Sequence, residues 1–171
     1  GERLLQSHED VQFFLPRAHT IERSELEAFI SERKVPVTVT EDHTYDLMQI
    51  CDVCLAASGT ATLETAMMEL PTVLLYKVSP ITYGIGKMVV NLTHVGLPNI
   101  VAGKEVIPEL LQDDVSVDAI VNTVLPLLDD LQVNQRMRTE LRSVRDKLGE
   151  PGAVNRVAQL IYNLGKENID E

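Results

Sequence analysis

The amino-acid sequence predicts an α/β protein, a Rossmann-like three-layer partial domain with a parallel sheet of about four strands and a closing cluster of helices. Two nearly continuous apolar runs, Asp52 to Ala57 and Thr72 to Tyr76, are typical of strands that are covered on both faces. Between them, four apolar residues recur at i, i+3, i+4 and i+7, namely Leu63, Ala66, Met67 and Leu70. This spacing predicts a helix that lies against the sheet and connects two parallel strands.

The flanking segments continue the alternation of strand and helix. The elements expected upstream are the tail of a helix in Gly1 to Glu9, a strand over Val11 to Leu15 that Pro16 ends, a helix over about 21 to 32 with Ser24 and Glu27 as a capping box, a strand over Val37 to Thr40, and a short helix over His43 to Ile50. Downstream, three apolar stripes begin at Val117, Met137 and Val154 and predict three helices, with a polar tail from Asn163.

Bulk properties narrow the function classes. The 171 residues are 44% hydrophobic, enough for one core and one domain. The formal charge of −11, from 26 acidic and 15 basic residues, disfavours nucleic acid as a partner. Cys51 and Cys54 cannot form a disulfide framework, so we expect a cytoplasmic setting. No apolar run approaches the roughly 20 residues that span a bilayer.

The stretch from Ser58 to Glu64 combines a strand end, a glycine and a helix start at the carboxyl edge of the predicted sheet, where ligands of open α/β sheets bind. Gly59 permits close backbone approach, and the hydroxyls of Ser58, Thr60 and Thr62 can donate to phosphate beside the free amides. Glu64 lies one turn later, where its carboxylate can accept from the ribose diol. This pattern favours a nucleotide, although an ordinary capped helix with a surface acid has the same residues.

A second stretch, Leu97 to Gln112, contains a rigid turn, an amide side chain, a glycine and a short helix predicted to open near Pro108. Its polar residues are able to face a cleft at the same edge of the predicted sheet as Ser58 to Glu64. Alone it also fits an ordinary surface loop.

Together these stretches resemble lipid-A-disaccharide synthases. The motifs are Ala57-Ser58-Gly59-Thr60-Ala61-Thr62-Leu63-Glu64, Tyr76-Lys77-Val78-Ser79-Pro80-Ile81-Thr82-Tyr83, Leu97-Pro98-Asn99, and Ala102-Gly103-Lys104-Glu105 through Pro108-Glu109-Leu110-Leu111-Gln112. Their order and spacing match, the resemblance runs to about Leu164, and it is densest between Asp52 and Gln112. It implies the C-terminal nucleotide-sugar-binding half of a GT-B glycosyltransferase, spanning residues 1–171.

The resemblance further implies an inverting transfer of 2,3-diacylglucosamine from UDP to lipid X, which is 2,3-diacylglucosamine 1-phosphate, giving the lipid A disaccharide 1-phosphate and UDP. It assigns Ser58, Gly59, Thr60 and Thr62 to the donor diphosphate, Glu64 to the ribose, and Asn99, Gly103 and Glu109 to the donor side of the cleft. Family members carry an earlier strand with a Gly-Ser-Arg loop and an N-terminal acceptor domain, neither of which is in this sequence. The catalytic base is therefore expected outside these residues, and the chain alone is expected to bind but hardly to catalyse.

Several other patterns carry less weight. Cys51 and Cys54 lack a second ligand pair for metal, Gly84 to Lys87 lacks the spacing of a P-loop, and the basic residues between Arg136 and Lys147 fit a solvated face with local ion pairs. We therefore expect no metal and no cofactor. The segment Ile81 to Leu92 is compatible with core packing, with peripheral contact to a membrane, or with a partner chain such as a second copy.

Two rival functions stay open at this point. One is another GT-B enzyme, such as an N-acetylglucosaminyl transferase or a UDP-sugar 2-epimerase, which would place similar phosphate and ribose contacts here. The other is a nonenzymatic nucleotide-binding module. Competition between donors and acceptors separates the first rival, and the context of the gene separates the second.

Overall fold

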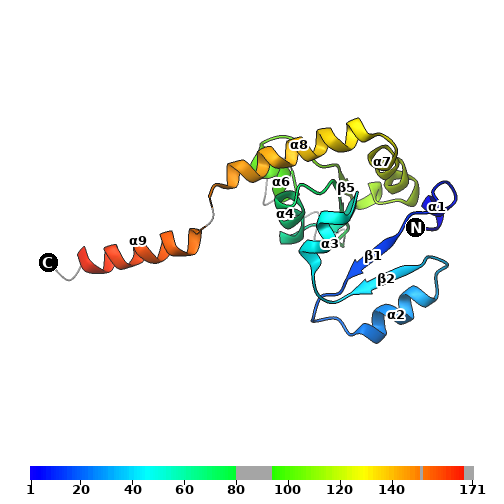
Figure 1. The fold of residues 1–171 in the computed structure, drawn as a ribbon, viewed down its shortest axis with the longest axis horizontal. Coiled ribbons are helices and arrows are strands. Elements are labelled where there is room, and N and C mark those ends of the chain that lie inside the picture. The colour runs from blue at the N-terminus through cyan, green and yellow to red at the C-terminus, as the bar shows by residue number, and fades with distance from the viewer. Residues whose placement is uncertain (80–93, 151, 168–171) are drawn as a thin grey trace.

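Alternating strands and helices form the first part of the chain, and helices dominate the last (Figure 1). A computed structural model describes residues 1–79, 94–150 and 152–167. The elements are α1 (Glu2–Leu5), β1 (Phe13–Pro16), α2 (Arg23–Ser31), β2 (Val37–Thr40), α3 (Thr44–Ile50), β3 (Cys54–Ala57), α4 (Thr60–Met67), β4 (Thr72–Tyr76), α6 (Leu97–Ala102), β5 (Glu109–Leu111), the 3-10 turn η1 (Gln112–Asp114), α7 (Val117–Asp129), α8 (Leu131–Leu148) and α9 (Ala153–Glu167).

The strands form two parallel sheets. β1 pairs with β2 so that Phe13 lies opposite Val37, while β3, β4 and β5 form a second sheet in that order. Level with Leu74 of β4 are Ala56 of β3 and Glu109 of β5. The predicted fold class and parallel pairing are confirmed, and the described strands are divided between a sheet of two and a sheet of three. Within the described residues no strand lies between β1 and β3 and pairs with both, so the two sheets remain separate.

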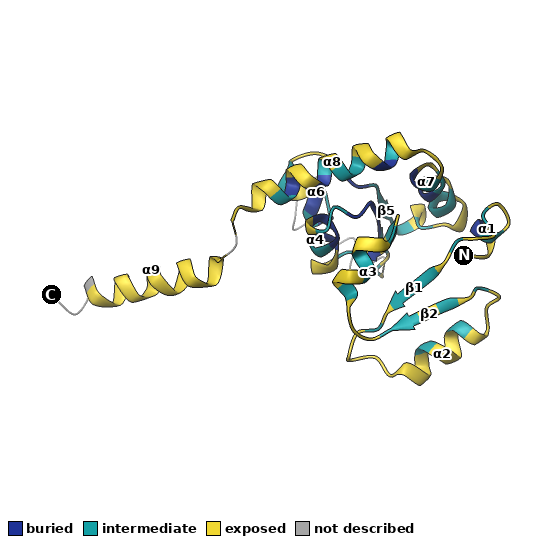
Figure 2. Cartoon of the chain, viewed as in Figure 1, coloured by how far each residue is buried: buried dark blue, intermediate teal, exposed yellow. Residues whose placement is uncertain are grey.

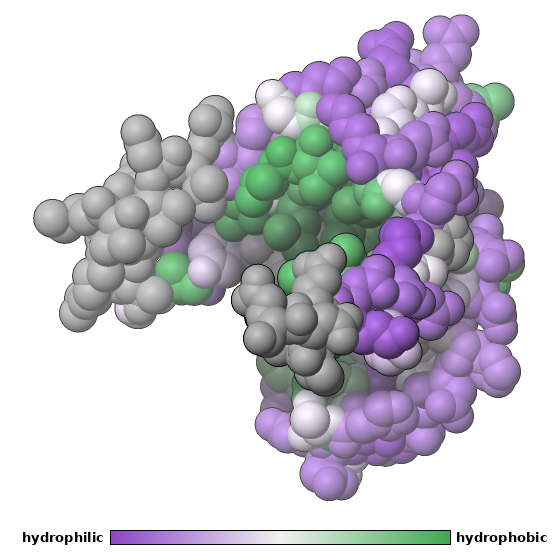
Figure 3. All heavy atoms as spheres, turned by 90° about the vertical axis from the view of Figure 1, so that its left-hand side faces the viewer, coloured by the Kyte–Doolittle hydropathy of each residue, from purple (hydrophilic) through white to green (hydrophobic). Residues whose placement is uncertain are grey.

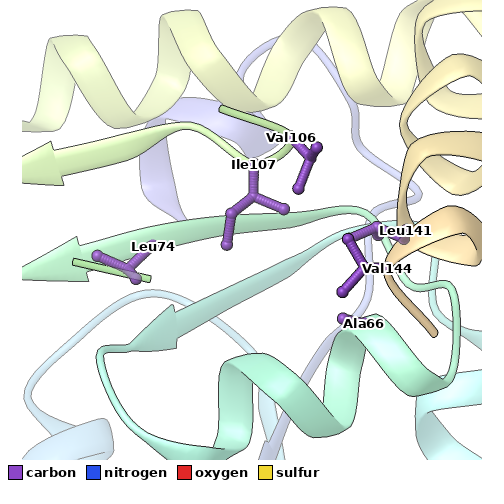
Figure 4. Close-up of a cluster of buried hydrophobic side chains, with 6 residues drawn as sticks. All are labelled: Ala66, Leu74, Val106, Ile107, Leu141 and Val144. Carbon is purple, nitrogen blue, oxygen red and sulfur yellow. The ribbon is translucent and has the colours of Figure 1, made fainter. Parts of the chain in front are cut away.

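Alternate residues of β4 face opposite layers. Leu74 belongs to a cluster formed by α4, α8 and the segment before β5, which also includes Ala66, Val106, Ile107, Leu141 and Val144 (Figure 4). Val73 belongs to a second cluster with Leu4, Val124 and Leu127, contributed by α1 and α7. Because successive side chains of a strand point to opposite faces, this division gives helix, sheet and helix layers around β4.

Two local predictions are wrong. Ser24 and Glu27 do not form a capping box, because α2 starts after Glu22 without a side-chain cap, and Glu27 accepts from Arg23 at 2.7 Å instead. The residues after Pro108 form the strand β5 rather than a short helix, because they pair in parallel with β4. Long-range backbone pairing therefore overrides the helical start that the proline suggested.

The basic residues of α8 contact residues that are distant in the sequence. Arg142 donates to Glu69, the residue that turns the chain after α4, at 2.7 Å, and Arg145 also contacts Glu69. Arg138 donates to the carbonyl oxygens of Glu69 and Cys51. These arginines lower the pKa of the Glu69 carboxyl. The ion pairs expected within the helix are thus mainly pairs that fasten α8 to the end of α4.

The C-terminal helix α9 projects away from the rest of the chain (Figure 1) and is exposed along its length (Figure 2). Its exposed apolar residues are Val154, Val157, Leu160, Ile161, Tyr162 and Leu164. Viewed from the α9 side, hydrophobic residues gather in the middle of the molecule with hydrophilic residues around them (Figure 3). Within the described ranges, no helix has the length and apolar character needed to cross a membrane.

Ile107→Ala tests the packing of this core. Ile107 is 0% exposed, and its loss leaves a cavity beside Leu74, so we expect the free energy of unfolding to fall by about 2–5 kcal/mol. Ile50→Ala is the matched control, because Ile50 is 72% exposed. Urea unfolding monitored by circular dichroism measures both variants, and equal midpoints would contradict this placement of Ile107.

Candidate functional site

The turn between β3 and α4 opens the carboxyl edge of the three-stranded sheet. β3 ends at Ala57, Gly59 adopts φ 151° and ψ −167°, and α4 begins at Thr60. A Cβ at Gly59 would meet nothing within 4 Å, so glycine is needed there for the backbone conformation, since L residues rarely adopt it. No side chain caps α4. Its first amides therefore receive no side-chain cap, and the positive end of the helix dipole lies at this turn.

The predicted diphosphate residues do not all face solvent. Gly59 and Thr60 are exposed and Ser58 is half-buried. Thr62 is 0% exposed, and its hydroxyl donates to the Gly59 carbonyl oxygen at 2.8 Å. Thr62 therefore fixes the shape of the turn, while Ser58, Gly59 and Thr60 form its accessible part.

Glu64 lies on the second turn of α4 and is joined there by a residue that the sequence did not single out. The Tyr45 hydroxyl, from the first turn of α3, donates to Glu64 Oε1 at 3.0 Å. Glu64 raises the pKa of the Tyr45 phenol, because the carboxylate accepts its hydrogen bond and carries a negative charge. The signal in the sequence was positional, since α3 directly follows β2 and so starts at the carboxyl edge of a parallel strand.

Asn99 is the centre of a buried hydrogen-bond network. It is 0% exposed, and its Oδ1 accepts from the backbone amides of Val106 at 2.7 Å and Ile107 at 2.9 Å. Its Nδ2 donates to the Ile107 carbonyl oxygen at 2.9 Å and to Glu109 Oε1 at 2.7 Å. Both groups of the amide are thus engaged inside the protein, where unpaired polar atoms are costly.

Glu109 extends this network to the start of α6. Its carboxylate accepts from the amides of Val95 and Gly96, each at 2.9 Å. Gly103 ends α6 in the left-handed region with φ 74°, and its amide donates to the Asn99 carbonyl oxygen at 2.8 Å. The three residues predicted for the donor side of the cleft therefore hold one continuous backbone segment in place.

The structure brings the two predicted stretches onto the same layer. α4 and α6 lie against one another and against α8 (Figure 1). The turn after β3 and the segment held by Asn99 thus border the same side of the sheet. The motif part from Pro80 to Tyr83, the amphipathic segment Ile81 to Leu92 and the residues Gly84 to Lys87 lie outside the described residues.

The cysteine pair lies away from this edge. Burial raises the pKa of the Cys54 thiol to about 11, and Cys51 is also a free thiol. Across residues 1–79, 94–150 and 152–167, no three side chains among His, Cys, Asp and Glu gather as metal ligands. The two thiols therefore carry no assignment to a metal or a redox reaction.

A hollow of about 420 Å³ lies near the amino end of β3, opposite the candidate edge, and includes Asp52, Asn134 and Arg138 in its lining. Asn134 donates to the carbonyl oxygens of Asp52 and Leu127, and Arg138 donates to the Asn134 side chain. Because these groups already bond to one another, the hollow has the character of a structural junction between α7, α8 and β3.

Asn99→Ala tests the buried network. The change leaves the amides of Val106 and Ile107 without an acceptor, so we expect a loss of at least about 2 kcal/mol in the free energy of unfolding. The matched control is Asn122→Ala, because Asn122 is exposed on α7. Denaturant unfolding of both variants is the measurement, and a fully stable Asn99→Ala protein would contradict the network.

Comparisons with known proteins identify one family. Residues 2–162 match the family model of lipid-A-disaccharide synthetase. The chain is 42% identical over 168 residues to the lipid-A-disaccharide synthase of Geobacter sulfurreducens, covering 98% of this chain and 44% of the relative. It is 36% identical over 165 residues to the lipid-A-disaccharide synthase of Syntrophotalea carbinolica, covering 96% of this chain and 42% of the relative. It is 37% identical over 170 residues to the lipid-A-disaccharide synthase of Nitrosococcus oceani, covering 99% of this chain and 44% of the relative.

The chain spans less than half the length of these relatives. With the model matched over nearly its whole length, the chain belongs to the lipid-A-disaccharide synthetase family.

Proposed function

We propose that this chain is the donor-binding part of an inverting glycosyltransferase that moves 2,3-diacylglucosamine from UDP to lipid X and releases UDP. The observation that carries the proposal is the uncapped start of α4, with the open backbone of Gly59 at one end and Glu64 one turn away. The names of the relatives support this reaction class over the rival enzymes and over a nonenzymatic module.

The diphosphate would lie against the accessible part of the turn. The amides of Gly59 and Thr60 and the hydroxyls of Ser58 and Thr60 are donors suited to phosphate oxygens, and the helix dipole adds positive potential. Thr62 contributes indirectly, because its hydroxyl holds the Gly59 carbonyl oxygen.

The ribose would lie at Glu64. Four residues of helix rise by about 6 Å, which separates the start of α4 from the Glu64 level by roughly the length of one nucleotide unit. A carboxylate accepts hydrogen bonds from both hydroxyls of a vicinal diol. The order of groups along α4 therefore fits phosphate first and ribose second.

Asn99, Gly103 and Glu109 would border the donor side of the cleft through the backbone that they hold. The side chains of Asn99 and Glu109 bond to one another and to the amides of Val95, Gly96, Val106 and Ile107. The Gly103 amide donates to the Asn99 carbonyl oxygen. We assign them to the shape of that wall and not to direct contact with the sugar.

The turn would act on the leaving group. In an inverting displacement the pyrophosphate gains negative charge as the glycosidic bond breaks, and the start of α4 stabilises that charge. A helix dipole contributes at most about 2 kcal/mol, whereas enzymes lower barriers by roughly 8–23 kcal/mol. The residues of this edge therefore account for donor binding, and the base that takes the proton of the acceptor hydroxyl is not assigned among them.

Contacts beyond the donor remain hypotheses of the same proposal. The acylated donor and lipid X favour a cytoplasmic protein that works at a membrane surface, and α9 carries exposed apolar residues. Contact of Ile81 to Leu92 with lipid or with a second copy of the chain stays a prediction.

Titration with UDP, followed by amide NMR, tests the proposal. We expect shifts that saturate and concentrate between Ser58 and Glu64, weaker binding of UMP because it lacks the second phosphate, and weaker binding of UDP to Glu64→Ala. Glu25→Ala is the matched control, since Glu25 is an exposed glutamate on α2. Unshifted amides in this stretch at high UDP concentration would refute the assignment.

A further inference from the structure

Tyr45 and Glu64 come from two different helices that both start at a carboxyl edge. Tyr45 lies in the first turn of α3, after β2, and Glu64 lies on α4, after β3. Their hydrogen bond of 3.0 Å joins the β1–β2 part of the chain to the three-stranded sheet. Tyr45 is 53% exposed, so the pair faces solvent and a ligand can reach it.

The hydrogen bond from Tyr45 engages one oxygen of the Glu64 carboxylate. Tyr45 donates to Oε1, and within the described part of the chain Oε2 receives no hydrogen bond. Glu64 is half-buried, and the rotational freedom that its side chain keeps is lost when it must accept from two ligand hydroxyls at once. A partner that already orients the carboxylate reduces this loss.

We propose that Tyr45 is the positioning residue for Glu64 and thereby sets the preference of the site for a ribonucleotide. The inference rests on the proposed function, because it takes the ribose to lie at Glu64. In the free protein the phenol holds the carboxylate in place. With nucleotide bound, Oε2 accepts from the ribose while Oε1 keeps its bond to Tyr45.

This role separates Tyr45 from the phosphate-binding turn. Tyr45 would add nothing to the recognition of the diphosphate, which would lie at Gly59 and Thr60, one helical turn before Glu64. Its contribution depends on Glu64 and on the ribose hydroxyls together. Removing Glu64 or the ribose hydroxyl would abolish the benefit of Tyr45, which is the pattern that a coupling cycle measures.

Calorimetric titration of the chain with UDP and with 2′-deoxy-UDP tests the inference. The measured quantity is the ratio of the two dissociation constants. For the unaltered chain we expect 2′-deoxy-UDP to bind about five- to tenfold more weakly, as for a lost hydrogen bond to a partly exposed carboxylate. Tyr45→Phe should weaken UDP binding by about two- to fivefold and reduce the ratio, and Glu64→Ala should bring the ratio to parity.

Two controls make the result specific. Tyr162→Phe removes the same hydroxyl from an exposed tyrosine of α9, which projects away from this edge (Figure 1), and should leave both dissociation constants unchanged. Tyr45→Phe in the Glu64→Ala background should have no further effect on either nucleotide. Circular dichroism confirms that each variant is folded, which is expected because Tyr45 is largely exposed.

The outcomes separate the two claims. If Glu64→Ala loses the discrimination and Tyr45→Phe keeps it in full, the ribose site stands and the positioning role of Tyr45 is wrong. If Tyr45→Phe weakens both nucleotides equally, even without Glu64, Tyr45 contacts the nucleotide directly and the inference is also wrong. If the unaltered chain does not bind UDP at all, the proposed function fails and this inference fails with it.

Discussion

The burial of β4 on both faces is the constraint on which the rest of the structure depends. Val73 and Leu74 are fully buried but point to opposite layers, so helices must cover both sides of the sheet. Parallel neighbours on both edges of β4 then require crossover connections, and α4 begins just beyond the carboxyl end of β3. The candidate site is a consequence of this arrangement, because α4 starts where β3 ends.

Within that frame, the polar residues of the site divide into those that shape the backbone and those that remain accessible. The side chains of Asn99, Glu109 and Thr62 form hydrogen bonds with other groups of the protein. Gly59 leaves open backbone, and Glu64 leaves one carboxylate oxygen. A rigid inner set that supports a small outer set is the arrangement that binding sites need, since an oriented donor or acceptor loses less entropy when a ligand arrives.

The sequence predicted the central elements well, because apolar runs and helical spacing report burial directly. The strands around Ala56 and Leu74 and the helix between them follow from such patterns. β5 was missed, since its three residues pair only through contacts with β4, and Pro108 resembles a helix start. The buried role of Asn99 and the contact of Tyr45 with Glu64 also escaped prediction. Hydrogen bonds between residues distant in sequence leave no periodic signal.

The central claim is that the diphosphate of a UDP-linked sugar binds at the start of α4. The most direct test is a crystal structure of the chain with UDP. We expect diphosphate oxygens within hydrogen-bonding distance of the amides of Gly59 and Thr60, with the ribose hydroxyls at Glu64. UDP bound elsewhere, for example in the hollow lined by Asp52 and Arg138, with the α4 turn empty, would contradict it.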